Sequence, residues 1–168
     1  QRQMCIRDRQ QGWHPINFFV SNIGFEEGWA EYAARLSLDS WGLDPDMMEV
    51  IFLDQEFSYL LMGLSDIGIN YGGWTVDDVY DLWETYFYLD SAEDVRDVYD
   101  ACMAEPGTIL SYSIGYYQIC DLEEEVKEML GESFDHNEFV TELLSVGGAS
   151  FDITRSYIME WANEKLHG

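Results

Sequence analysis

Apolar residues recur at three- and four-residue spacing along most of this chain, and this pattern constrains the fold more than any other feature. Residues 46–70 show the helical repeat most clearly, through Leu53, Phe57, Leu60, Leu61 and Leu64. No stretch of useful length alternates apolar and polar residues as a half-buried strand would. We therefore predict an all-α fold, with these five side chains on the apolar face of a long helix, the face that in a globular protein packs on the core.

Prolines, glycines and capping residues divide the chain into about seven predicted helices. Asp44-Pro45 precedes the long helix, and Pro106 and Gly131 bound another. Polar residues with an acid three positions later are typical of helix starts. The predicted helices cover 25–38, 46–70, a segment after Thr75, a segment after Ser91, 106–130, 135–146, and a last one from Ser150 or Asp152.

The first eleven residues differ from the rest in charge and show no periodicity. Arg2, Arg7 and Arg9 are three of the eight basic residues of the whole chain. The run from Met4 to Arg9 resembles translated sequencing-adapter read-through. We therefore interpret residues 1–11 as a non-native segment and leave it out of the fold prediction, which makes the chain truncated at its N-terminus.

The charge balance excludes some classes of partner. The chain has 33 acidic and 8 basic residues, a formal net charge of −25. Such a surface repels nucleic-acid phosphates and anionic lipid head groups, so we expect no nucleic-acid or membrane-surface role. No segment is long and apolar enough to span a bilayer. The acidic run Glu123–Glu125 is expected to be a solvated helix face.

The chain lacks the common motifs of metal and nucleophilic catalysis. Its three histidines are His14, His136 and His167, of which no two share a helix turn, and no His-Glu-x-x-His is present. The three cysteines are too widely spaced for a zinc ribbon. Serine-nucleophile and phosphate-loop motifs are also absent. The chain alone cannot supply a standard zinc site.

Four polar side chains on predicted helix faces could complete a site begun elsewhere, namely Glu27, Asp66, Asn70 and Tyr112. Glu27 precedes a Gly-Trp pair and is either a buried ligand or a solvated acid in a first helical turn. Asp66 and Asn70 share a helix face, and either act together or cap their helix. Tyr112 is either a site residue or a core tyrosine with a satisfied hydroxyl.

Several segments together resemble the bacterial domain of unknown function 885. They are Phe25-Glu26-Glu27-Gly28-Trp29-Ala30, then Asp66-Ile67-Gly68-Ile69-Asn70-Tyr71, then Leu110-Ser111-Tyr112-Ser113-Ile114-Gly115. Their order and spacing carry the resemblance, which covers roughly residues 13–166. The family is mostly helical, and its full-length members resemble thermolysin-type zinc peptidases, with a His-Glu-x-x-His-like helix upstream of Glu-Gly-Trp-Ala.

The resemblance implies that residues 12–168 are the C-terminal helical part of a single catalytic-type domain, in a zinc-dependent hydrolase acting on peptides. Glu27 would be the carboxylate ligand of zinc, with two histidines and a general-base glutamate upstream. Tyr112 would donate to a developing oxyanion, while Asp66 and Asn70 would orient ligands or bind substrate. With one ligand of three, the chain alone is expected to be inactive and not to bind zinc tightly. The family also implies export to the cell envelope.

The chain departs from the commonest family pattern at three positions. Asn70 and Val140 stand where many members carry histidine, and Ser113 where many carry a basic residue. Two alternatives follow: a divergent active subgroup, or a non-catalytic helical binding domain that kept the scaffold. A third is an acidic module that recruits a basic partner. The oligomeric state is left open.

Overall fold

A computed structural model describes residues 21–38, 42 and 44–168, and within these ranges the protein is all-α. Seven α-helices and two short 3₁₀ helices are present, without a strand in the described part, as predicted. The interpretation of residues 1–11 lies outside the described residues. The elements are α2 (Ile23–Ser37), α3 (Pro45–Asn70), α4 (Val76–Trp83), η3 (Ala92–Val95), α5 (Arg96–Ala104), α6 (Thr108–Leu130), η4 (Gly131–Ser133), α7 (His136–Val146) and α8 (Phe151–His167).

Most of the predicted helix starts are present as capping interactions. The Thr75 hydroxyl accepts from the Asp78 amide at 3.4 Å, and the Asp78 carboxylate accepts from the Thr75 amide at 2.7 Å. Ser91 forms the same reciprocal box with Asp94. Each box satisfies backbone N–H groups that a helix start leaves without an intrahelical acceptor.

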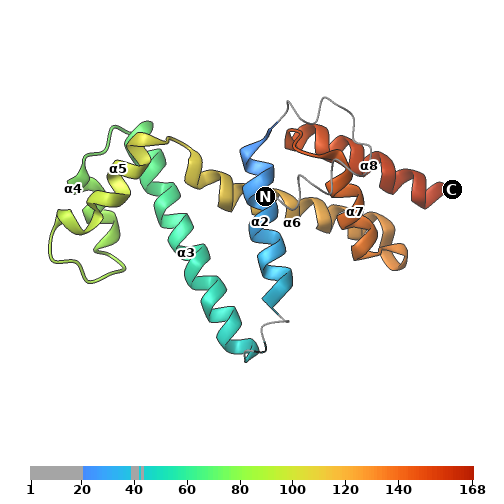
Figure 1. Ribbon diagram of the computed structural model, residues 1–168, viewed down its shortest axis with the longest axis horizontal. Coiled ribbons are helices and arrows are strands. Elements are labelled where there is room, and N and C mark those ends of the chain that lie inside the picture. Colours follow the sequence, from blue (N-terminus) through green and yellow to red (C-terminus); the bar gives the residue numbers. More distant parts are fainter. Residues whose placement is uncertain (1–20, 39–41, 43) are drawn as a thin grey trace.

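Helix α6 is the central element of the fold. It packs against α2, α3 and α8, and Figure 1 shows α3, α4 and α5 on one side of it and α7 and α8 on the other. The larger apolar cluster is formed by α6 with α2, α7, α8 and Phe52 of α3, and it includes Ile119, Val126, Phe139 and Leu143. A smaller cluster joins α3, α4, η3 and α5 around Ile69, Val79, Val95 and Cys102.

Two glycines allow α2 and α6 to touch through their backbones. A Cβ added to Gly28 would lie 2.2 Å from the carbonyl carbon of Gly115, and one added to Gly115 would lie 2.0 Å from the carbonyl oxygen of Gly24. Any larger residue would therefore force the helices apart. This contact fixes the position of α2 on α6, and with it the side chains that α2 presents.

The buried face of α3 differs from the prediction. Leu61 is buried, but the other four predicted core residues, Leu53, Phe57, Leu60 and Leu64, are exposed. The residues that α3 buries include Met48, Phe52, Gly63, Ser65, Asp66 and Ile69. The prediction was wrong because periodicity identifies an apolar face but does not say whether the described chain supplies anything to cover it.

Candidate functional site

Glu27 lies at a site formed by three helices. Glu27 and Glu31 lie one turn apart on α2, and both are half-buried. The Tyr59 hydroxyl and the Gln55 amide, both from α3, donate to Glu31 at 3.1 and 2.9 Å. Tyr112 on α6 lies close enough to Glu27 for the two side chains to interact electrostatically, and the Tyr112 ring centroid lies 5.4 Å from that of Tyr59. We call these five residues the Glu27 site.

The electrostatics of the Glu27 site keep its hydroxyls protonated and disfavour a second full negative charge. Burial raises the pKa of Tyr112, and the negative charge of the nearby Glu27 carboxylate raises it further. Burial also raises the pKa of Glu31; the Tyr59 hydrogen bond opposes this, while the charge of Glu27 adds to it. Tyr112 is therefore a hydrogen-bond donor at neutral pH.

Asp66 and Asn70 are brought together at a different place. The Asp66 side chain is buried, with the residue only 3% exposed. One oxygen accepts from the Gly107 amide at 2.7 Å and the other from the Asn70 amide at 2.8 Å. Asn70 also donates to the carbonyl of Cys102 at 3.0 Å. We call these four residues the Asp66 junction, because it joins α3, the end of α5 and the start of α6.

The Asp66 junction caps α6. Gly107 is the N-cap of α6, has φ +80° and makes no side-chain cap of its own. Asp66 supplies the missing acceptor from another helix, and its carboxylate at the N-terminus complements the helix dipole. Tyr112 lies in the second turn of the same helix. The junction therefore holds the start of α6 in place, and with it the position of Tyr112 relative to Glu27.

Ser113 and Val140, two of the departures from the family pattern, lie inside the fold. Ser113 is buried, and Val140 packs against the larger apolar cluster. A serine and a valine at such positions need no charge compensation, which a buried basic side chain would require.

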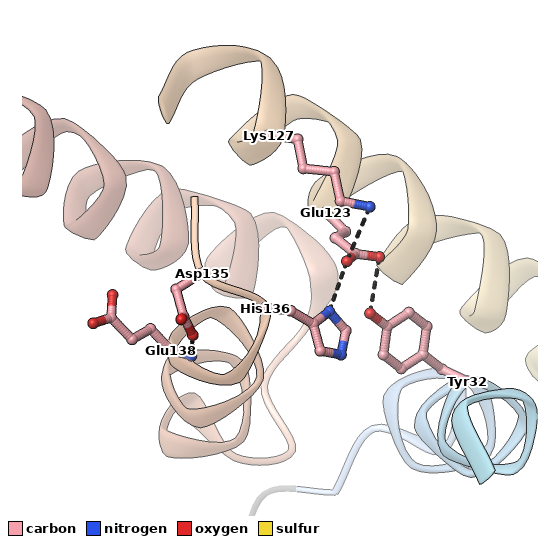
Figure 2. A network of polar contacts seen from close by, with 6 residues as sticks. All are labelled: Tyr32, Glu123, Lys127, Asp135, His136 and Glu138. Atoms are coloured by element: carbon pink, nitrogen blue, oxygen red, sulfur yellow. Dashed lines mark hydrogen bonds and ion pairs between the residues drawn. The ribbon is translucent and has the colours of Figure 1, made fainter. Parts of the chain in front are cut away.

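A third polar cluster was missed by the sequence interpretation. Glu123 was expected to be solvated, but its side chain is only 12% exposed. It accepts from the Tyr32 hydroxyl at 2.8 Å, pairs with Lys127 at 3.1 Å and lies 2.9 Å from His136 Nδ1 (Figure 2). The i,i+4 spacing to Lys127 was readable from the sequence. Tyr32 and His136 come from α2 and α7, and no local sequence pattern reveals that their side chains reach Glu123.

The partners of Glu123 stabilise its ionised form. Burial alone would raise its pKa, but hydrogen bonds from His136, Tyr32 and Lys127 outweigh burial and lower it. The same burial, with the Glu123 carboxylate, raises the pKa of Tyr32 well above the ordinary tyrosine value. The cluster therefore links α2, α6 and α7 through one charged acceptor beside the larger apolar core.

The described residues do not supply a metal site by themselves. No group of three or more histidine, cysteine, aspartate or glutamate side chains in residues 21–38, 42 and 44–168 is placed to hold an ion. A carboxylate such as that of Glu27 is nevertheless a suitable zinc ligand. Its place on a helix held by the glycine contact suits one ligand of a set completed by other residues.

None of the described helices has the length and hydropathy needed to cross a bilayer.

Comparisons with known proteins identify one family and one fold relative. Residues 2–158 match the family described as "Bacterial protein of unknown function (DUF885)". A solved structure described as "the putative lipoprotein from Colwellia psychrerythraea" is similar with a TM-score of 0.72 at 24% identity. The match covers 84% of this chain and 24% of that chain, so this chain spans about a quarter of the solved protein. No curated protein matches.

Proposed function

The chain belongs to the bacterial protein family of unknown function DUF885, and on that premise we propose that it is the C-terminal portion of a zinc-dependent, peptidase-like hydrolase. In this proposal Glu27 is the carboxylate ligand of the metal. The observation that carries it is the convergence of α2, α3 and α6 at the Glu27 site, where Tyr59 and Gln55 of α3 hold Glu31 and the Glu27 carboxylate lies near enough to Tyr112 to raise its pKa.

The residues around Glu27 support this assignment by the way they hold it. Gly28 follows Glu27 directly and packs against Gly115, so the ligand-bearing turn of α2 has little freedom to move. Glu31 is held by Tyr59 and Gln55, which keeps a second acid oriented one turn away. Rigid support of this kind is what a metal ligand requires.

Each side chain then has a defined role. When bound, zinc would polarise a peptide carbonyl and activate a water molecule. Glu27 would hold the metal, and Tyr112 would donate a hydrogen bond toward the charge that develops on the carbonyl oxygen. Asp66 and Asn70 would act indirectly, because their contacts are with each other and with the backbone at the start of α6.

The proposal includes a place for the longer protein. The solved relative is described as a lipoprotein, which supports an extracytoplasmic location at the cell envelope. Because the matched part is about a quarter of that relative, the remaining metal ligands and the general base would come from residues outside the described part of this chain.

The test is the Glu27→Gln substitution in the full-length protein. Zinc content by mass spectrometry and cleavage of a peptide library are the two measurements. We expect the zinc to be largely lost and the cleavage rate to fall by about 100-fold or more, because loss of a direct ligand should cost at least as much as the roughly 10–100-fold seen for residues that only support a ligand. Glu26→Gln is the matched control, since Glu26 is exposed and adjacent.

Two results would refute the proposal. One is a full-length protein that binds no zinc, and the other is a Glu27→Gln protein that keeps its zinc and its activity. Either result would favour the non-catalytic helical binding domain instead.

A further inference from the structure

One face of α3 carries a continuous row of exposed apolar side chains. The residues are Val50, Leu53, Phe57, Leu60, Leu64 and Ile67, and we call this row the α3 seam. Their exposed fractions lie between 38% for Phe57 and 61% for Val50. Figure 1 shows α3 beginning near the C-terminal end of α2 and diverging from α2 toward its own C-terminal end. The seam therefore covers most of the length of a 26-residue helix.

The spacing of the α3 seam is that of a helix–helix interface. Successive members are three, four, three, four and three residues apart, which is the a/d repeat of knobs-into-holes packing. A single exposed leucine needs no explanation, but a contiguous apolar row marks an interaction surface. Phe57 also packs against Tyr86 and Phe87, at centroid distances of 5.2 and 6.1 Å, and these two exposed rings widen the surface.

The charges beside the α3 seam disfavour a second copy of the same chain. Glu49, Asp54 and Glu56 flank its first half, and α3 contains no basic residue. Two α3 seams packed in parallel would bring these like charges into opposition, and in any orientation two copies would each carry a net charge of −25. A helix with basic flanking residues would be complementary.

The solved relative indicates where such a helix could come from. The match covers only 24% of that chain, so most of the relative lies outside the part that corresponds to α2–α8. We propose that the α3 seam is an internal interface, which docks an amphipathic helix with Lys or Arg flanks from the remainder of a longer chain. This inference does not depend on the zinc proposal.

The test uses thiol labelling of a Leu60→Cys variant in the longer protein. Glu124→Cys, on the exposed side of α6, is the matched control. The rate of maleimide labelling at each position is followed by peptide mass spectrometry, so the native cysteines do not interfere. We expect Leu60→Cys to label about tenfold or more slowly than the control, because labelling would require local opening. In the 168-residue chain alone, the two should label at similar rates.

Three outcomes would overturn the proposal. Equal labelling of the two variants in the longer protein would mean that the α3 seam stays uncovered. A dimer of the 168-residue chain in sedimentation that dissociates on Leu60→Asp would assign the seam to a second copy. A full-length sequence with no apolar helix bearing basic flanks would remove the proposed occupant.

Discussion

Replacing Asp66 with alanine should destabilise the protein by removing the cap of α6. The carboxylate accepts from the Gly107 amide and from Asn70 while almost wholly buried. A buried hydrogen bond to a charged group contributes about 1.5–3 kcal/mol, and its loss also leaves donors unsatisfied. Loss of a helix N-cap costs about 1 kcal/mol. These contributions overlap, so we expect a fall of about 3 kcal/mol in the free energy of unfolding.

The assay is urea denaturation followed by far-ultraviolet circular dichroism. Asp66→Asn keeps one acceptor oxygen and should lose about half as much stability. Asp54→Ala is the control, because Asp54 is an exposed acid on the same helix and should change stability by less than about 0.5 kcal/mol. An Asp66→Ala protein as stable as the control would refute the capping argument. If the junction also positions Tyr112, Asp66→Asn in the full-length protein should lower kcat more than it raises KM.

Two further predictions concern the packing of α2 on α6 and the Glu123 cluster. Gly115→Ala should lower the free energy of unfolding by about 3 kcal/mol or more through overpacking. Gly24→Ala should lower it far less, because the new Cβ would meet only side-chain atoms, at 3.2 and 3.6 Å. Equal melting temperatures of the two variants would contradict the backbone contact. Glu123→Gln should cost about 1–3 kcal/mol at pH 7. The folded pKa of Glu123 is lowered, so the stability that its ionised form contributes is present above the ordinary pKa of 4.5 and is lost as the pH falls through the folded pKa. The free energies of unfolding of the variant and the wild type should therefore converge in acid. A difference that does not change with pH would contradict this.

Much of the fold could be predicted from the sequence because its signals are local. Capping pairs such as Thr75 with Asp78, and stops such as Gly131, lie within one helical turn of the boundary they mark. The spacing of Asp66 and Asn70 likewise predicted that they share a helix face, and the structure joins them by a hydrogen bond.

The parts that could not be predicted depend on partners far along the chain. Glu123 becomes a buried acceptor only because Tyr32, 91 residues away, and His136 on another helix reach it. The apolar row on α3 was predicted to pack on the core. A repeat of leucines looks the same in the sequence whether or not the described chain supplies a segment that packs against it. The spacing placed Glu31 on the same helix face as Glu27, but Glu31 was not predicted as a site residue, because its partners Tyr59 and Gln55 lie on a different helix.

The division into two apolar clusters has a consequence for how the protein opens. The smaller cluster around Val79 and Val95 is separate from the larger one around α6, α7 and α8, and α3 and the Asp66 junction connect the two. Cooperative units in proteins tend to coincide with such supersecondary pieces. Amide protons in α4 and α5 should therefore exchange with solvent through a sub-global opening, at a lower free energy than those in the middle of α6. Unfolding would begin at the α4–α5 end of the molecule, while α2 and α6 remain packed together at Glu27.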